Sequence, residues 1–187
     1  MSYDLYCFLP RSDVPSIEEA QGIIESEETG GKVDDAKSVE TKLKVVGALT
    51  ECNPRLEPFR FDFAAIATLR KISEEQARRE SNHIELNPPE GDPAIQLTVF
   101  GDHVAINIPY WYTGSQAEAT FEQIGNYLRV IRRAVGFFVY DPQTDRVFDP
   151  EKEELSHESY ERIVRDIPNI IAASKSKKEG KPWWKFW

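Results

Sequence analysis

The sequence predicts an α+β fold in which an antiparallel sheet is covered by amphipathic helices. Alternating apolar residues mark three consecutive strands at 83–86, 94–100 and 103–112, which form a meander. Apolar residues at spacings of three and four mark helices on both sides of this meander. With 187 residues, of which 40% are hydrophobic, the chain can bury one core. We therefore expect one domain at 1–173, followed by a Lys- and Trp-rich tail at 174–187.

The N-terminal half should supply one strand and two helices. Residues 3–9 alternate, as a strand that enters the core does. Ser16-Ile17-Glu18-Glu19 has capping-box spacing, so a helix of about 10–12 residues should follow. A second helix is expected over 34–50. A short strand at 59–63 and a loose helical stretch should come next, and the charged residues 74–81 should be solvated.

The C-terminal half should continue with a turn, a long helix, a hairpin and a last helix. Gly101-Asp102 fits a primed hairpin turn, with Gly supplying the positive φ. Ser115-Gln116-Ala117-Glu118 is a second capping box, and Gly136 should end the helix that it starts. A strand, a turn and a returning strand should lead to a helix at 156–173, which Pro168 should kink or divide.

Charge favours a basic partner and argues against nucleic acid. The net charge is −9, and it is −13 over residues 1–170, because the last 17 residues hold five Lys and one Glu. Such a body repels phosphate backbones. Two stretches, 13–35 and 141–161, hold eight acidic residues each. There is neither a long apolar run nor a secretory signal, so we expect a cytoplasmic protein without a membrane span.

No motif in the sequence indicates a catalytic, cofactor-binding or metal-binding residue. Cys7 and Cys52 are too few and too far apart for a zinc or redox motif, and we expect both thiols to be buried. The three histidines have no second ligand at helical spacing, and no nucleophile elbow or phosphate-binding glycine loop occurs. The alternative is a small hydrolase or transferase whose site, from residues such as His103, Glu118 and Asp141, forms only in the fold.

Acidic and aromatic side chains are the candidates for partner binding. The acids would steer a basic protein, and Tyr110-Trp111-Tyr112 would supply an anchor if not all three pack in the core. The tail concentrates aromatic residues beyond a Lys-rich spacer, so it should dock on its own domain or on a protein, with a membrane interface as the alternative. The candidates are Glu18, Glu19, Glu25, Glu27, Glu28, Tyr110, Trp111, Tyr112, Asp141, Asp145, Trp183, Trp184 and Trp187.

Two motifs carry a resemblance to a group of proteins. YDLYCFLP at 3–10 and VYDPQTDRVFDP at 139–150 resemble small uncharacterised bacterial proteins with a YDLYFW-like start and a YDPQTG-like turn. This sequence departs from that pattern at Cys7 and Leu9, and Asp145 stands where Gly is usual. The resemblance implies an α+β domain without known enzyme activity, of the kind that serves as an immunity or accessory protein to secreted toxins. It transfers no functional residue, because the motifs are a strand and a turn.

These observations together favour a binding protein over an enzyme. The expected function is that of a non-enzymatic cytoplasmic protein which neutralises a basic toxin by binding it. The alternatives are the hydrolase or transferase and a peripheral accessory protein tethered through its tail.

Overall fold

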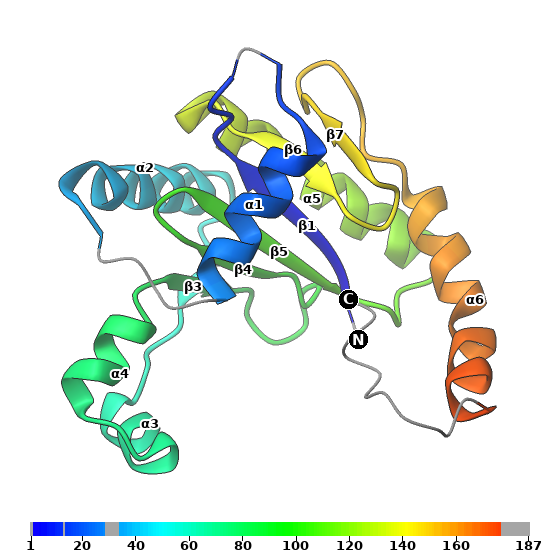
Figure 1. The fold of residues 1–187 in the computed structure, drawn as a ribbon. Coiled ribbons are helices and arrows are strands. Elements are labelled where there is room, and N and C mark those ends of the chain that lie inside the picture. Colours follow the sequence, from blue (N-terminus) through cyan, green and yellow to red (C-terminus); the bar gives the residue numbers. More distant parts are fainter. Residues whose placement is uncertain (1, 13, 29–33, 177–187) are drawn as a thin grey trace.

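A computed structural model describes residues 2–12, 14–28 and 34–176, of which 26–28 and 167–176 by their backbone alone. It contains helices and one antiparallel sheet, which confirms the α+β prediction (Figure 1). No helix in these ranges is both long and apolar enough to span a bilayer. In chain order the elements are β1 (Ser2–Phe8), α1 (Ile17–Glu28), α2 (Ala36–Cys52), β2 (Glu57–Pro58), α3 (Phe63–Arg70), α4 (Glu74–Glu80), β3 (Ile84–Asn87), β4 (Gln96–Val99), β5 (His103–Pro109), α5 (Ser115–Val135), β6 (Phe138–Asp141), β7 (Arg146–Phe148) and α6 (His157–Ser176).

The sheet has the strand order β2-β3-β4-β5-β1-β6-β7. β1 lies between β5 and β6, so the N-terminal strand does enter the core, as its alternating aromatic residues predict. The meander is also confirmed: β3, β4 and β5 are neighbours, and Val99 pairs with Val104 across the hairpin. Each strand therefore presents alternate residues to the two faces of one continuous sheet.

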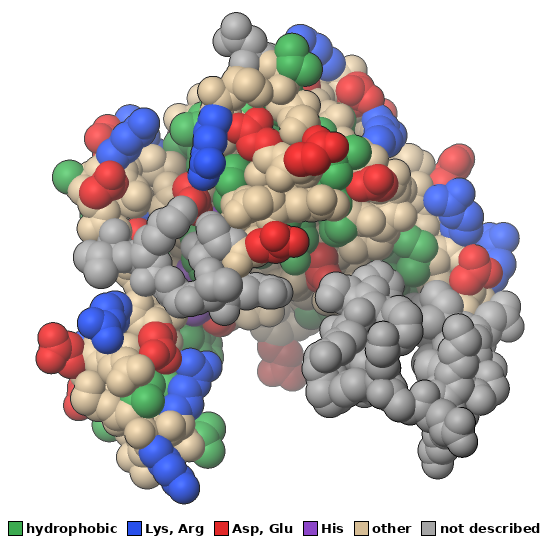
Figure 2. Space-filling view, in the orientation of Figure 1, with side chains coloured by type: hydrophobic (Ala, Val, Ile, Leu, Met, Phe, Trp, Pro, Cys, Tyr) green, Lys and Arg blue, Asp and Glu red, His purple; other side chains and the backbone are tan. Residues whose placement is uncertain are grey.

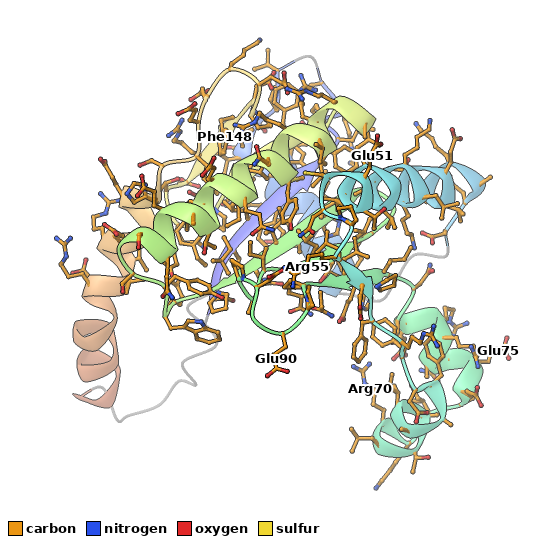
Figure 3. The ribbon with its side chains drawn as sticks, turned by 180° about the vertical axis from the view of Figure 1, so that it is seen from behind. Glu51, Arg55, Arg70, Glu75, Glu90 and Phe148 are labelled. Atoms are coloured by element: carbon orange, nitrogen blue, oxygen red, sulfur yellow. The ribbon has the colours of Figure 1, made fainter. Side chains whose placement is uncertain are left out.

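Helices cover the two faces unequally. α2 and α5 lie on one face and bury Tyr3, Leu5 and Cys7 of β1 (Figures 1 and 3). α5 is the amphipathic helix that the spacing of apolar residues predicts, and Gly136 ends it with φ 78°. Of the described helices, α1 alone lies on the opposite face, over a small cluster of Phe8, Ala20, Ile23 and Tyr140. Because that cluster belongs to α1, β1 and β6, it leaves the β2-β3-β4 side of the face outside this apolar contact.

Three local predictions about caps and turns had different outcomes. α1 begins as expected, since the Ser16 hydroxyl accepts a hydrogen bond from the Glu19 amide (3.2 Å). The box at 115–118 is wrong: Ser115 is already helical, Gly114 is the N-cap, and no side chain caps α5. The positive φ at Gly101 is also wrong. A Cβ there would lie 2.6 Å from the Cβ of Ser38, so close approach of α2 explains this glycine.

The segment 55–81 differs most from the sequence prediction. Its strand is β2, two residues earlier than the alternating phenylalanines suggest, and the solvated run 74–81 contains a helix, α4. α3 and α4 form a hairpin that stands out from the sheet (Figure 1). None of the α3 residues is buried, and in Figure 2 the hairpin shows charged and apolar side chains together. The two helices contact each other through the Arg70–Glu80 ion pair (3.5 Å) and through Arg78 over the Phe63 ring (4.5 Å).

The predictions for Pro168 and for Cys52 also need correction. α6 runs without a division through Pro168. Cys52, the last residue of α2, is exposed, whereas Cys7 is buried as expected. Burial raises the pKa of the Cys7 thiol, so this side chain acts as an apolar core residue.

Candidate functional site: a polar row and the Trp111 groove

One cross-strand row on the α1 side of the sheet consists of polar residues alone. Glu57 of β2 pairs with Asn87 of β3, and Gln96 of β4 pairs with Asn107 of β5. Asn107 in turn pairs with Asp4 of β1 and donates a hydrogen bond to its carboxylate (2.7 Å). We call these five residues the polar row. They alternate with core residues such as Leu86, Leu97 and Ile106.

The row is partly exposed. Glu57 is exposed, and the other four side chains are half-buried. The Gln96 amide donates to Glu85 (3.2 Å), whose other carboxylate oxygen faces His83 (3.1 Å). Side-chain amides can donate hydrogen bonds to a peptide backbone and accept hydrogen bonds from it. The carboxylates on either side of these amides can attract a cation.

Beside the row lies an open groove of about 520 Å³, which we call the Trp111 groove. Its walls are the β3–β4 loop and the end of β5, and it shares Asn87 and Pro88 with a second groove of about 670 Å³ along β2. Figure 3 shows Glu90 at the outer end of the loop, pointing away from the domain. The Trp111 groove is lined by Asn87, Pro88, Pro89, Glu90, Gly91, Asp92, Ala94, Gln96, Pro109 and Trp111.

Trp111 is the exposed member of the predicted aromatic run. Its side chain is 68% exposed, whereas Tyr110 and Tyr112 pack against the core. Tyr110 stacks on the buried Tyr160 ring of α6, and desolvation by burial, followed by the Asp4 charge, raises the pKa of Tyr110 to about 12. β5 ends at Pro109, and Tyr110 and Trp111 lie in the turn that follows, so the turn rather than strand alternation separates the two side chains. An exposed tryptophan on a groove rim is the side chain that most often anchors a protein partner.

A hydrogen-bonded frame fixes the backbone around Trp111. The Tyr160 hydroxyl donates to the Pro109 carbonyl (2.6 Å) and accepts from the Tyr112 amide (3.1 Å). The Tyr112 hydroxyl accepts from the Ala94 amide (2.5 Å), which joins the β3–β4 loop to the end of β5. Both sides of the groove are therefore held in place before any ligand binds, which lowers the entropy cost of binding.

The electrostatic character of the groove is acidic. Asp92 pairs with Arg55 (2.8 Å), so its charge is largely neutralised. Glu57 and Glu90 are exposed, and no ion pair to either occurs among the described residues. The adjoining groove is also lined by an exposed cation, Arg60. These two glutamates therefore give the site its free negative charge.

The candidate glutamates of the acidic stretch 13–35 belong to α1, which covers the face of the sheet that carries the polar row. Glu18 and Glu25 are exposed, and Figure 2 shows acidic side chains on this face. A hydrogen bond from its own helix-start amide lowers the pKa of Glu18. Glu19 has a structural contact, because it accepts from the Arg11 amide and the Ser12 hydroxyl. The side chains of Glu27 and Glu28 lie outside the described part.

The two candidate residues of the second acidic stretch differ in exposure. Asp141 is 3% exposed and accepts from the Tyr3 hydroxyl (2.6 Å) and the Gln143 amide (2.9 Å). Asp145 is exposed, with φ 52°, in the turn between β6 and β7. Asp141 is therefore a structural residue rather than a partner-binding one, and Asp145 is placed by its turn. Trp183, Trp184 and Trp187 lie outside the described residues.

The structure does not bring together the three residues of the enzyme alternative. His103 pairs with Phe8 at one end of β1, whereas Asp141 bonds to Tyr3 near the other end. Glu118 lines a separate groove of about 270 Å³. Among the described residues, no group of three or more acidic, His or Cys side chains could hold a metal ion.

Sequence reasoning missed the polar row and the loop beside it. The available signal was the second phase of the alternating strands, in which Asp4, Gln96 and Asn107 interrupt otherwise apolar or aromatic segments. The pairing of these residues depends on strand order, which the sequence leaves open. In comparisons with known proteins, no family model, curated protein or solved structure matches this chain.

Proposed function

We propose that this chain is a non-enzymatic binding protein which captures a basic protein partner in the Trp111 groove. We further propose that the partner is a secreted toxin which the chain neutralises in the cytoplasm. The observation that carries the first proposal is Trp111, an exposed aromatic on the rim of a preformed acidic groove. The second follows the resemblance of the two end motifs to immunity and accessory proteins.

Charge and layout support this proposal. The net charge of −9 would speed encounter with a cationic protein, and exposed Glu57 and Glu90 would direct it to the groove. The amides of the polar row offer hydrogen bonds to a bound main chain. Trp111 would supply apolar contact from the rim of the groove, because tryptophan is enriched among the residues that carry most of the binding energy.

Affinity capture from the source cells tests the proposal. The tagged chain should retain one basic protein at low salt and lose it as salt rises, because exposed charges are screened over about 10 Å at 0.1 M. Trp111→Ala should weaken this binding by more than tenfold, roughly the loss of one anchor residue. The matched control is Leu69→Ala, since Leu69 is 85% exposed on α3, away from the groove.

Two outcomes would contradict the proposal. One is capture of a partner whose affinity is the same for Trp111→Ala, Leu69→Ala and the unaltered chain, which would move the interface elsewhere. The other is a chain that retains no protein but holds a small molecule, which would favour the enzyme alternative.

A further inference from the structure

The composition of the C-terminal tail complements that of the Trp111 groove. Residues 177–187 contain four Lys and one Glu, together with Pro182 and four aromatic residues. The Trp111 groove offers the exposed carboxylate of Glu90, three prolines and the exposed ring of Trp111, and the adjoining groove adds the exposed carboxylate of Glu57. Charge and apolar surface are thus complementary, and a Lys- and Trp-rich segment can place cations near carboxylates and over the indole face.

The geometry of α6 brings this segment within reach. α6 begins at the groove, because Tyr160 bonds to Pro109 and Tyr112, the residues on either side of the Tyr110-Trp111 pair. From Tyr160 to Ser176 the helix extends about 24 Å at 1.5 Å per residue. The 11 residues beyond Ser176 span up to about 36 Å when extended, so they can return the whole length of the helix. Figure 1 shows α6 and the β3–β4 loop at the same end of the molecule.

We propose that residues 177–187 bind the Trp111 groove of their own chain. Lys185, which nine residues of about 3.3 Å each separate from Ser176, approaches Glu57 or Glu90, and the aromatic residues on either side of it pack against Trp111 and Pro88. The inference rests on the proposed function only in treating the groove as a binding site. A basic partner would then have to displace this segment.

Attachment favours the same chain over a second copy. A tether of this length gives an effective concentration in the millimolar range, far above the micromolar concentrations of a typical solution experiment. A weak contact that would not hold two molecules together is therefore sufficient within one.

Zero-length carbodiimide cross-linking of the full chain tests the inference. An equal mixture of ¹⁴N- and ¹⁵N-labelled protein at micromolar concentration is cross-linked, digested and analysed by mass spectrometry. We expect amide bonds between lysines of 177–187 and Glu57 or Glu90, within molecules of one label. Trp111→Ala should reduce their yield at least fivefold, and Leu69→Ala, the control, should leave it unchanged.

Three results would overturn the inference: links from these lysines to acids elsewhere, such as Glu18 or Glu25; links that join the two labels; or an undiminished yield in Trp111→Ala. Because this experiment needs no partner, it is independent of the capture experiment. Links without a captured partner contradict the proposed function alone, and a captured partner without links contradicts this inference alone.

Discussion

Two acid-rich parts of the molecule use their carboxylates in different ways. In the segment 141–153, acids bond to groups of the same domain: Asp141 to Tyr3, Asp149 to Arg132, Glu151 to Arg133. Around the Trp111 groove, Glu57 and Glu90 are exposed to solvent, and Figure 3 shows Glu90 pointing away from the domain. Acid content alone therefore does not identify a binding surface. The comparison teaches that the buried acids Asp141 and Asp149 are held by donors of the same domain, whereas the acids free for a partner lie on a loop and an edge strand.

The largest expected effect is the loss of Asp141. Asp141→Ala removes the acceptor of the buried Tyr3 hydroxyl and of the Gln143 amide, and should lower the free energy of unfolding by about 2–4 kcal/mol. Desolvation, followed by the bond to Asp141, raises the pKa of Tyr3, so its hydroxyl remains a donor at all ordinary pH values. Urea denaturation measures the change.

Tyr3→Phe is the matched control for Asp141→Ala, because it removes the donor and keeps the ring. We expect it to cost about 1 kcal/mol, since the carboxylate retains its backbone donors. If Asp141→Ala lowered the free energy of unfolding no more than Tyr3→Phe does, Asp141 would contribute as little to stability as the exposed glutamates at the groove. The contrast between the two acid-rich parts would then be wrong.

The next effect concerns the paired side chains of Arg132 and Asp149. Two hydrogen bonds of 3.0 Å join the guanidinium to the carboxylate, which is 7% exposed. Arg132→Ala should lower the free energy of unfolding at pH 7 by about 1–3 kcal/mol. Arg146→Ala is the control, because its pair with Glu153 is exposed and should contribute less than about 1 kcal/mol.

The effect of Arg132→Ala should depend on pH in a fixed direction. The hydrogen bonds from Arg132 lower the pKa of Asp149 below its usual 3.8. A carboxyl whose pKa is lower in the folded state stabilises the protein above its unfolded pKa, and this contribution disappears as pH falls through the folded pKa. The difference between Arg132→Ala and the unaltered chain should therefore shrink below about pH 4. A difference that stays constant to pH 2 would show that packing, not charge, sets it.

A smaller effect, of opposite sign, is expected in the turn at Asp145. The backbone has φ 52° there, a conformation that costs a non-glycine residue about 1 kcal/mol. Asp145→Gly should therefore raise the free energy of unfolding by about 0.5–1 kcal/mol, by thermal or urea denaturation. Asp145→Ala, which keeps the Cβ, should give no gain. A loss on Asp145→Gly would mean that the contact of Asp145 with the Tyr140 hydroxyl (3.4 Å) outweighs the strain.

Sequence patterns predicted the strands of the sheet and the long helices, because each depends on local spacing, but they left open which member of the aromatic run is exposed. α5 follows from the apolar positions between Phe121 and Ile131, and β1 from the alternation of residues 3–9. The reason for a glycine at 101 is its close approach to Ser38 of α2, and the polar row forms only when distant strands pair. Such long-range contacts leave no trace in local periodicity. The same holds for acids, since Asp141 and Glu90 look alike until burial separates them.

The smallest expected effect on stability tests the other side of the comparison. Glu57→Lys combined with Glu90→Lys reverses two exposed charges that have no ion pair among the described residues, so the free energy of unfolding should change by less than about 0.5 kcal/mol. The same double variant should bind a basic partner more slowly and with weaker salt dependence, because the charges that direct encounter have changed sign. Denaturation and association kinetics at two salt concentrations give both values. A stability loss above 1 kcal/mol would assign these glutamates to the fold, and unchanged kinetics would remove them from the proposed binding surface.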